Sequence, residues 1–167
     1  HGMTVSTLDR YKGRATSYDV IQAGMNYRID ESRSSLGLSQ LRRLKSNLVR
    51  RKEINQMYVD QLTDVDTLSI PFQNRDNEDV GYHIFPILLH HADDRESFMA
   101  FLQEKKIQTS IHYPPIHQFS AYREMTENCG CPLTESVASR EVTLPFYPDM
   151  SDEDVQYVCD AIKVYKK

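Results

Sequence analysis

The sequence lacks any long apolar run, and its uninterrupted hydrophobic stretches are only a few residues long. This absence excludes a helix of the length that crosses a bilayer. An excess of positive charge is also missing, because 24 acidic residues outnumber 20 basic ones and the formal net charge is -4. The charge therefore does not point to nucleic acid or to an anionic membrane as a partner.

Cysteine is scarce, with one residue at each of positions 129, 131 and 159. An odd number of cysteines, after a start with neither the basic nor the apolar segment of a signal peptide, argues against a disulfide framework. Cys129 and Cys131 could form half of a metal site, but no second pair of cysteines or histidines follows at zinc spacing. We expect free thiols, no metal, and a soluble, cytoplasmic protein.

The chain is long enough for one domain with an appended segment. Its 167 residues are 40% hydrophobic and 26% charged, as in ordinary globular domains. Residues 1–30 are polar and show neither helical nor strand periodicity, which predicts an extended arm. We expect a long helix over residues 31–62 and an α+β domain over residues 63–167.

The long helix is predicted from its start signal and from its apolar spacing. Asp30 is a favourable N-cap, and Glu31 adds negative charge to the first turn. Apolar residues then recur at helical spacing, with a slight slip in register near the middle. The residues of this stripe are Leu41, Leu44, Leu48, Ile54, Met57, Tyr58 and Leu62.

Basic residues gather largely off this stripe, between positions 42 and 52 of the predicted helix. Such a cluster could bind phosphates. In an acidic chain it is more typical of a solvated face beside acidic neighbours, and we favour that interpretation. Its members are Arg42, Arg43, Lys45, Arg50, Arg51 and Lys52.

Three strands are predicted in the second part of the chain. Residues 64–79 are polar and predict a connection. Strands are then predicted over 82–89, 108–112 and 141–144. Pro86 indicates that the first lies at a sheet edge or contains a bulge, because proline lacks a ladder donor.

Three helices are predicted between and after these strands. An acidic N-cap at position 93 or 94 begins a helix that ends at Lys105. A short helix is expected over 134–140, and Ser151 with Asp154 forms a capping box for the last helix. Strands and helices in this order predict a small sheet flanked by helices, an α+β fold. The buried faces of the first and last helices are expected to carry Phe98, Phe101, Leu102, Val155, Val158 and Ile162.

The segment directly before the long helix carries the first candidate binding residues. Asn26 supplies an amide, Tyr27 a phenol and Arg28 a guanidinium, close to the unpaired backbone N–H groups of a helix start. Such a place can hold a phosphate. Asp30 weakens this hypothesis by adding negative charge, and the segment alone is more typical of a capped loop with a packed tyrosine.

The loop 112–117 carries the second group. Pro114 and Pro115 fix the backbone between His112 and His117, and a stiff loop suits side chains that are presented to a ligand. A metal site is an alternative, although no third ligand lies nearby in the sequence. A structural role for either histidine is the other alternative.

Several short motifs follow one another along nearly the whole chain. They are residues 1–3 (HGM), 24–28 (GMNYR), 35–41 (SLGLSQL), 112–117 (HYPPIH), 121–123 (AYR) and 144–151 (LPFYPDMS). In this order and spacing the sequence resembles the DegT/DnrJ/StrS family of pyridoxal-phosphate-dependent aminotransferases, which act on nucleotide-linked keto-sugars. Met25 departs from the family pattern, since many relatives have tyrosine there.

The resemblance implies the fold of a type I aminotransferase, of which this chain would be the C-terminal small domain with the long helix that leads into it. In that family a large N-terminal domain binds pyridoxal phosphate (PLP) and carries the Schiff-base lysine, which a glycine-rich stretch follows. Residues 1–30 would continue from that large domain. Lys12 lies in the wrong segment and lacks the glycine-rich continuation, so no catalytic residue is assigned.

The resemblance also implies an active site that is shared across a homodimer. Asn26 is similar to the asparagine that reaches the cofactor phosphate of the partner subunit, with Tyr27 and Arg28 nearby. The loop 112–117 would line the sugar side of the cleft. The candidate substrate-binding residues of that loop are His112, Tyr113 and His117.

The function implied for the parent protein is transfer of an amino group, from glutamate, to a nucleotide-linked keto-sugar in polysaccharide or related glycan synthesis. The chain alone, without a Schiff-base lysine, is expected to be inactive. A non-catalytic interaction or oligomerisation module derived from the same fold is the alternative. Nucleic-acid binding through the basic cluster of the helix is a second, weaker alternative.

Overall fold

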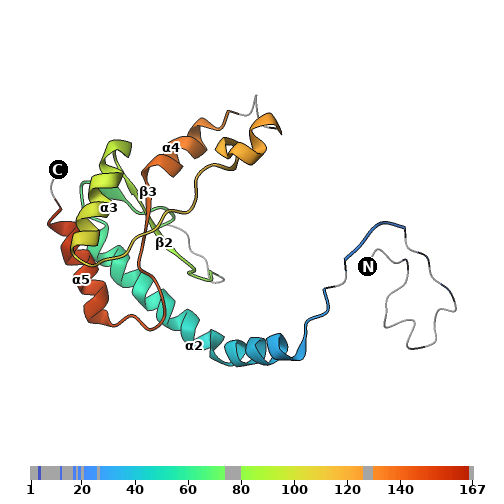
Figure 1. Cartoon of the computed structure of the whole chain (residues 1–167). Helices are drawn as coiled ribbons and strands as arrows, with labels where there is room; N and C mark the ends of the chain where they lie inside the picture. Colours follow the sequence, from blue (N-terminus) through green and yellow to red (C-terminus); the bar gives the residue numbers. More distant parts are fainter. Residues whose placement is uncertain are drawn as a thin grey trace. The chain divides into compact units, whose positions relative to one another are not determined.

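The computed structural model describes residues 4, 12, 17, 19, 21–25, 27–73, 80–125 and 130–165. The chain divides into two compact units, residues 1–43 and 44–167. The second unit contains the sheet and most of the helices (Figure 1). In chain order the elements are α2 (Glu31–Leu62), β1 (Leu68–Ser69), β2 (Phe85–Leu89), η1 (Ala92–Asp94), α3 (Arg95–Glu104), η2 (Ile116–Gln118), η3 (Ser120–Met125), α4 (Pro132–Arg140), β3 (Glu141–Leu144) and α5 (Asp152–Lys163).

The sheet has three antiparallel strands in the order β1-β2-β3. Pro86 pairs with Thr143, whose backbone N–H and C=O both bond to Ser110 on the other side of β3. Pro86 is therefore in a non-hydrogen-bonded pair, and its missing donor faces the side away from β3. That side carries β1 only opposite Leu88 and Leu89, so the proline occupies a local edge, as predicted.

The helix α2 begins where the sequence predicts. The Asp30 carboxylate accepts the backbone N–H of Arg33 at 2.8 Å, which is the N-cap bond. Only the last turns of the predicted apolar stripe are buried, at Ile54, Tyr58 and Leu62. The first half of the stripe is exposed, for example at Leu41 and Leu44.

The core lies between the sheet, the end of α2, and the helices α3 and α5, which lie side by side (Figure 1). Phe98 of α3 meets Tyr165, just after α5, edge to face with ring centroids 5.0 Å apart. The capping box of α5 is confirmed, since Ser151 Oγ accepts the Asp154 N–H and the Asp154 carboxylate accepts the Ser151 N–H. The predicted α+β fold is confirmed. Its predicted buried helix residues Phe98, Leu102, Val155, Val158 and Ile162 are all buried, and Phe101 packs against them.

Two side chains of α2 hold the segment 144–151, which leads from β3 to α5. The buried Tyr58 hydroxyl donates to the Pro145 carbonyl at 2.9 Å. Arg50 donates at 2.7 Å to the Met150 carbonyl and at 2.7 Å to an Asp152 carboxylate oxygen. Arg50 of the basic cluster and Tyr58 of the apolar stripe therefore both have a structural role.

Two predicted features of the loops and caps are wrong. The segment 64–79, predicted as a connection only, contains the two-residue strand β1. Asp94 does precede α3, but its side chain makes no capping bond, because the short turn η1 already leads the chain into the helix.

Candidate functional site

His112 is brought to the sheet by a single bridge between Ser110 and Thr143. The Ser110 N–H donates to the Thr143 carbonyl at 3.1 Å, and the Thr143 N–H donates to the Ser110 carbonyl at 2.8 Å. In an antiparallel register, His112 then lies opposite Glu141. The predicted strand 108–112 is reduced to this bridge.

The pairing does not continue to His112 because Glu141 is also the C-cap of α4. Its backbone N–H donates to the Val137 carbonyl and closes α4, so it does not pair with the segment at His112. The His112 N–H donates instead to the Glu141 carboxylate Oε2 at 2.8 Å. The Glu141 side chain thus takes the place of a backbone carbonyl as the acceptor for the His112 N–H.

The same carboxylate begins a short hydrogen-bond network. The Thr143 hydroxyl donates to Glu141 Oε1, and His112 Nδ1 lies 2.8 Å from Thr143 Oγ1. Glu141 and Thr143 are both buried, at 5% and 4% exposure. A buried carboxylate with partners on both oxygens avoids the cost that an unpaired buried charge would carry.

A pocket of about 510 Å³ opens beside this network. His112 and Thr143 line it together with Tyr147, Asp154 and Tyr157. This volume lies in the range of small-molecule sites, and a few polar groups among apolar walls are typical of them. Tyr113, 71% exposed, contacts the His112 ring with centroids 4.6 Å apart. The cis peptide bond of this loop joins these two residues.

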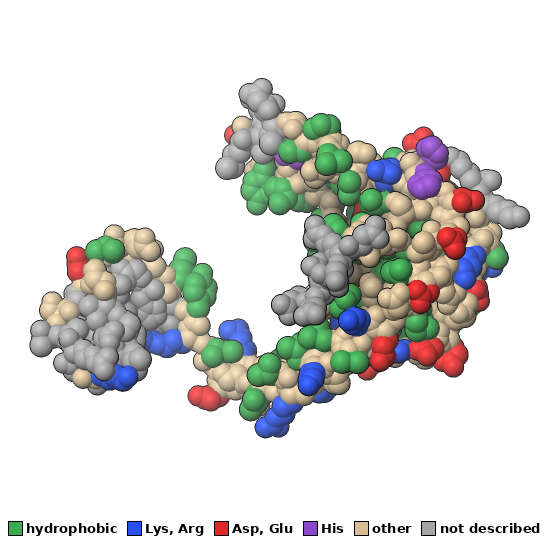
Figure 2. All heavy atoms as spheres, turned by 180° about the vertical axis from the view of Figure 1, so that it is seen from behind, with side chains coloured by type: hydrophobic (Ala, Val, Ile, Leu, Met, Phe, Trp, Pro, Cys, Tyr) green, Lys and Arg blue, Asp and Glu red, His purple; other side chains and the backbone are tan. Residues whose placement is uncertain are grey.

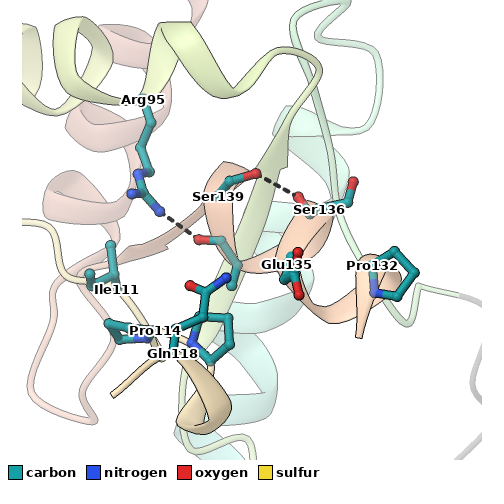
Figure 3. A pocket seen from close by; sticks show the side chains of 10 residues that line it. Arg95, Ile111, Pro114, Gln118, Pro132, Glu135, Ser136 and Ser139 are labelled. Carbon is teal, nitrogen blue, oxygen red and sulfur yellow. Dashed lines mark hydrogen bonds between the residues drawn. The ribbon is translucent and has the colours of Figure 1, made fainter. Parts of the chain in front are cut away.

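His117, at the other end of the loop, belongs to a different set of contacts. Its Nε2 lies 2.8 Å from Glu135 Oε1 of α4, which also accepts the Cys131 N–H at 3.4 Å. Glu135 lines a second pocket of about 540 Å³ with Pro114 and Arg95 (Figure 3). His112 therefore lines the first pocket, whereas His117 contacts Glu135, a residue that lines the second.

Arg95 forms one wall of this second pocket. It reaches from the first turn of α3, and its guanidinium donates to the Ala138 carbonyl of α4 (Figure 3). The guanidinium therefore ties α3 to α4 at the pocket edge.

The segment before α2 presents its described candidate residues to solvent. Tyr27 is 86% exposed and Arg28 is exposed, while Asn26 lies outside the described residues. The start of α2 already carries the Asp30 carboxylate, which also pairs with Arg33 Nε at 3.3 Å. An anion at this segment would therefore depend on the Tyr27 and Arg28 side chains more than on the helix start.

Sequence reasoning missed Glu135, Glu141 and Thr143. Glu141 and Thr143 carried a signal, because residues i and i+2 of a strand share one face and two polar residues on a buried strand need partners. Glu135 carried none, since an acidic residue in the first turn of a helix is ordinary.

Among the described residues, no group of three or more His, Cys, Asp or Glu side chains could hold a metal ion. None of the helices in the described part of the chain is long and apolar enough to cross a membrane.

The fold matches that of the C-terminal region of solved aminotransferase structures. The chain belongs to the DegT/DnrJ/EryC1/StrS aminotransferase family, whose model matches residues 1–163. It is similar to the uncharacterized protein MJ1066 of Methanocaldococcus jannaschii, with 29% identity over 169 residues. The match covers 98% of this chain and 44% of that protein.

Two solved structures are also similar. The sugar aminotransferase CalS13 from Micromonospora echinospora is 25% identical, with a TM-score of 0.76, over 97% of this chain and 41% of that one. The putative sugar aminotransferase Spr1654 from Streptococcus pneumoniae, in its PMP-form, shares the fold at 24% identity and a TM-score of 0.76. That match covers 98% of this chain and 41% of Spr1654.

These matches limit what the family membership says of the chain. The chain spans only about two fifths of the length of these relatives. Homologues in the family bind PLP or PMP, and Spr1654 is known in both forms.

Proposed function

We propose that this chain is the C-terminal portion of a PLP-dependent aminotransferase that transfers an amino group, from glutamate, to a nucleotide-linked keto-sugar in glycan synthesis. The observation that carries the proposal is the family match over residues 1–163, which includes both candidate segments. PLP, when bound, supplies the electron sink for the exchange of the amino group. The residues of this chain are proposed to bind and orient the cofactor and the substrate. The lysine that holds the cofactor is proposed to lie outside these 167 residues.

The segment before α2 is proposed to bind the cofactor phosphate. Arg28 is exposed and always charged, and a guanidinium offers several donors to a phosphate. The exposed Tyr27 phenol adds a further donor, and Asn26 is assigned the same role from its place in the motif. These donor types fit a phosphate, whereas the Asp30 carboxylate at the helix start does not.

The loop 112–117 is proposed to form part of the substrate wall. His112 lines the 510 Å³ pocket, and the exposed Tyr113 ring lies against the His112 ring. An imidazole and a phenol beside apolar walls suit a sugar, which presents hydroxyl groups on an apolar ring face. His117, whose Nε2 contacts Glu135 of the second pocket, is proposed as a separate substrate contact on the other side of the loop.

A homodimer that shares the active site is the proposed assembly. Apolar side chains stay exposed along the first half of α2 (Figure 2). Exposed apolar side chains along one helix are typical of an interaction surface, which supports this proposal. Its largest members are Leu36 at 61% exposure, Leu38 at 52%, Leu41 at 64% and Leu44 at 48%.

The first test concerns the cofactor. The 167-residue chain, mixed with stoichiometric PLP and reduced with borohydride, is expected to retain no single modified lysine by peptide mass mapping. The full-length protein that contains this chain is expected to retain one, and to move the amino group of ¹⁵N-glutamate to a nucleotide keto-sugar. A full-length protein without lysine-bound PLP would refute the aminotransferase proposal.

A matched pair of variants tests the phosphate segment. Arg28→Ala in the full-length protein is expected to raise the PLP concentration for half-maximal activity about tenfold, the loss of one charge-assisted bond. Lys52→Ala, which removes an equal charge from an exposed position in the second half of α2, serves as the control. Equal effects of the two changes would contradict the assignment of Arg28.

A further inference from the structure

Glu141, Thr143 and His112 form a chain of hydrogen bonds in which each proton has a defined place. An ionised carboxylate only accepts, so the Thr143 hydroxyl donates its single proton to Glu141 Oε1. The hydroxyl therefore has no proton left for the 2.8 Å hydrogen bond between Thr143 Oγ1 and His112 Nδ1. The proton in that bond must belong to the imidazole ring, so Nδ1 is the donor and Thr143 Oγ1 the acceptor.

The neutral imidazole carries one N–H, and its other nitrogen is an acceptor. With the proton on Nδ1, the acceptor is Nε2. Within the described part of the chain no hydrogen bond is made to Nε2, while His112 lines the 510 Å³ pocket. The same Glu141 carboxylate fixes the backbone of His112 through its N–H.

We propose that Glu141 and Thr143 are positioning residues that hold the neutral His112 ring in its Nδ1–H tautomer, so that Nε2 offers an acceptor to a hydroxyl or N–H of the bound sugar substrate. The identity of the ligand rests on the proposed function, whereas the proton arrangement rests on the hydrogen bonds alone. The arrangement also favours ligand groups that donate a hydrogen bond over groups that only accept one. A ligand carbonyl facing Nε2 would bring two acceptors together.

The replacement of Glu141 by glutamine gives the sharpest test. The amide oxygen of Gln can accept the His112 N–H only if its NH₂ group faces Thr143 Oγ1. Thr143 then accepts from the amide, and its own proton turns to His112 Nδ1. Glu141→Gln is therefore expected to invert the tautomer and move the ring proton to Nε2.

The measurement is a long-range ¹H–¹⁵N correlation spectrum of the labelled chain at about pH 8.5, above the usual histidine range. The signals of His112 are assigned from their loss in His112→Gln. In the wild type, Nδ1 is expected at the pyrrole-type shift and Nε2 at the pyridine-type shift. The exposed His90 should give averaged shifts and serves as the internal control.

Three variants separate positioning from a merely structural role. Glu141→Gln is expected to exchange the two ¹⁵N shifts, Thr143→Val to move both toward averaged values, and Thr143→Ser to keep the wild-type pattern. A wild-type ring protonated on Nε2, or a folded Glu141→Gln that keeps the proton on Nδ1, overturns the proposal. If Glu141→Gln does not fold, equal tautomers in wild type and Thr143→Val overturn it.

No cofactor or substrate enters this measurement, so its outcome is independent of amino transfer. A full-length protein that fails to transfer the amino group refutes the proposed function and leaves the tautomer in place. A wrong tautomer refutes the positioning role and leaves the family assignment untouched.

Discussion

The Tyr58 hydroxyl lies at the junction between α2 and the segment that leads to α5, and Tyr58→Phe removes only this oxygen. The ring keeps its place against Phe85, with centroids 4.7 Å apart, so packing is conserved. The lost interaction is the 2.9 Å bond to the Pro145 carbonyl. A net hydrogen bond contributes about 1 kcal/mol, and we expect the variant to be less stable by that amount at neutral pH.

Alkaline pH should reverse this order. Burial raises the pKa of Tyr58 well above its usual value of 10.0, so the folded phenol stays protonated while the unfolded chain ionises. Stability from this group is complete below pH 10 and is lost as the pH rises above it. At pH 11 the wild type has lost about 1.4 kcal/mol through Tyr58, a loss that the phenylalanine variant does not share.

The two stability curves should therefore cross between about pH 10 and 11. Urea unfolding followed by far-ultraviolet circular dichroism at pH 7, 10 and 11 measures the difference. Tyr157→Phe is the control, since its phenol also donates to a backbone carbonyl but is half exposed, and no crossing is expected. A difference between wild type and Tyr58→Phe that is the same at pH 7 and pH 11 would refute the reasoning.

Two further changes test the helix ends. Ser151→Ala removes the side chain that accepts the Asp154 N–H and should cost about 1 kcal/mol in urea unfolding, whereas Ser139→Ala, inside α4, should cost less than half as much. Lys106 follows the C-cap of α3 and has a φ of 60°, so Lys106→Gly should raise stability by about 0.5 kcal/mol. Lys105→Gly, at the C-cap with a φ of -81°, should lower it. A loss of stability in Lys106→Gly would show that the left-handed conformation carries no cost there.

The elements with local signals were predictable. Asp30 marks the start of α2, and Ser151 with Asp154 marks the start of α5, because capping chemistry is contained within four residues. Apolar periodicity alone does not show which part of the α2 stripe is buried, because it identifies a face but not what covers it. The strand β1 has two residues, too few for any period to appear.

The network at His112 shows where local signals end. Glu141 and Thr143 alternate with Val142 and Leu144, so the sequence does place two polar groups on one face of a strand. Their partner comes from a segment 29 residues away in the chain, through the Ser110 bridge. The segment 108–112 was predicted to form a full strand. It is not one because the Glu141 N–H is already used to close α4, a conflict that only the assembled structure reveals. The carboxylate left beside His112 is the consequence, and it makes this histidine the better supported candidate of the two.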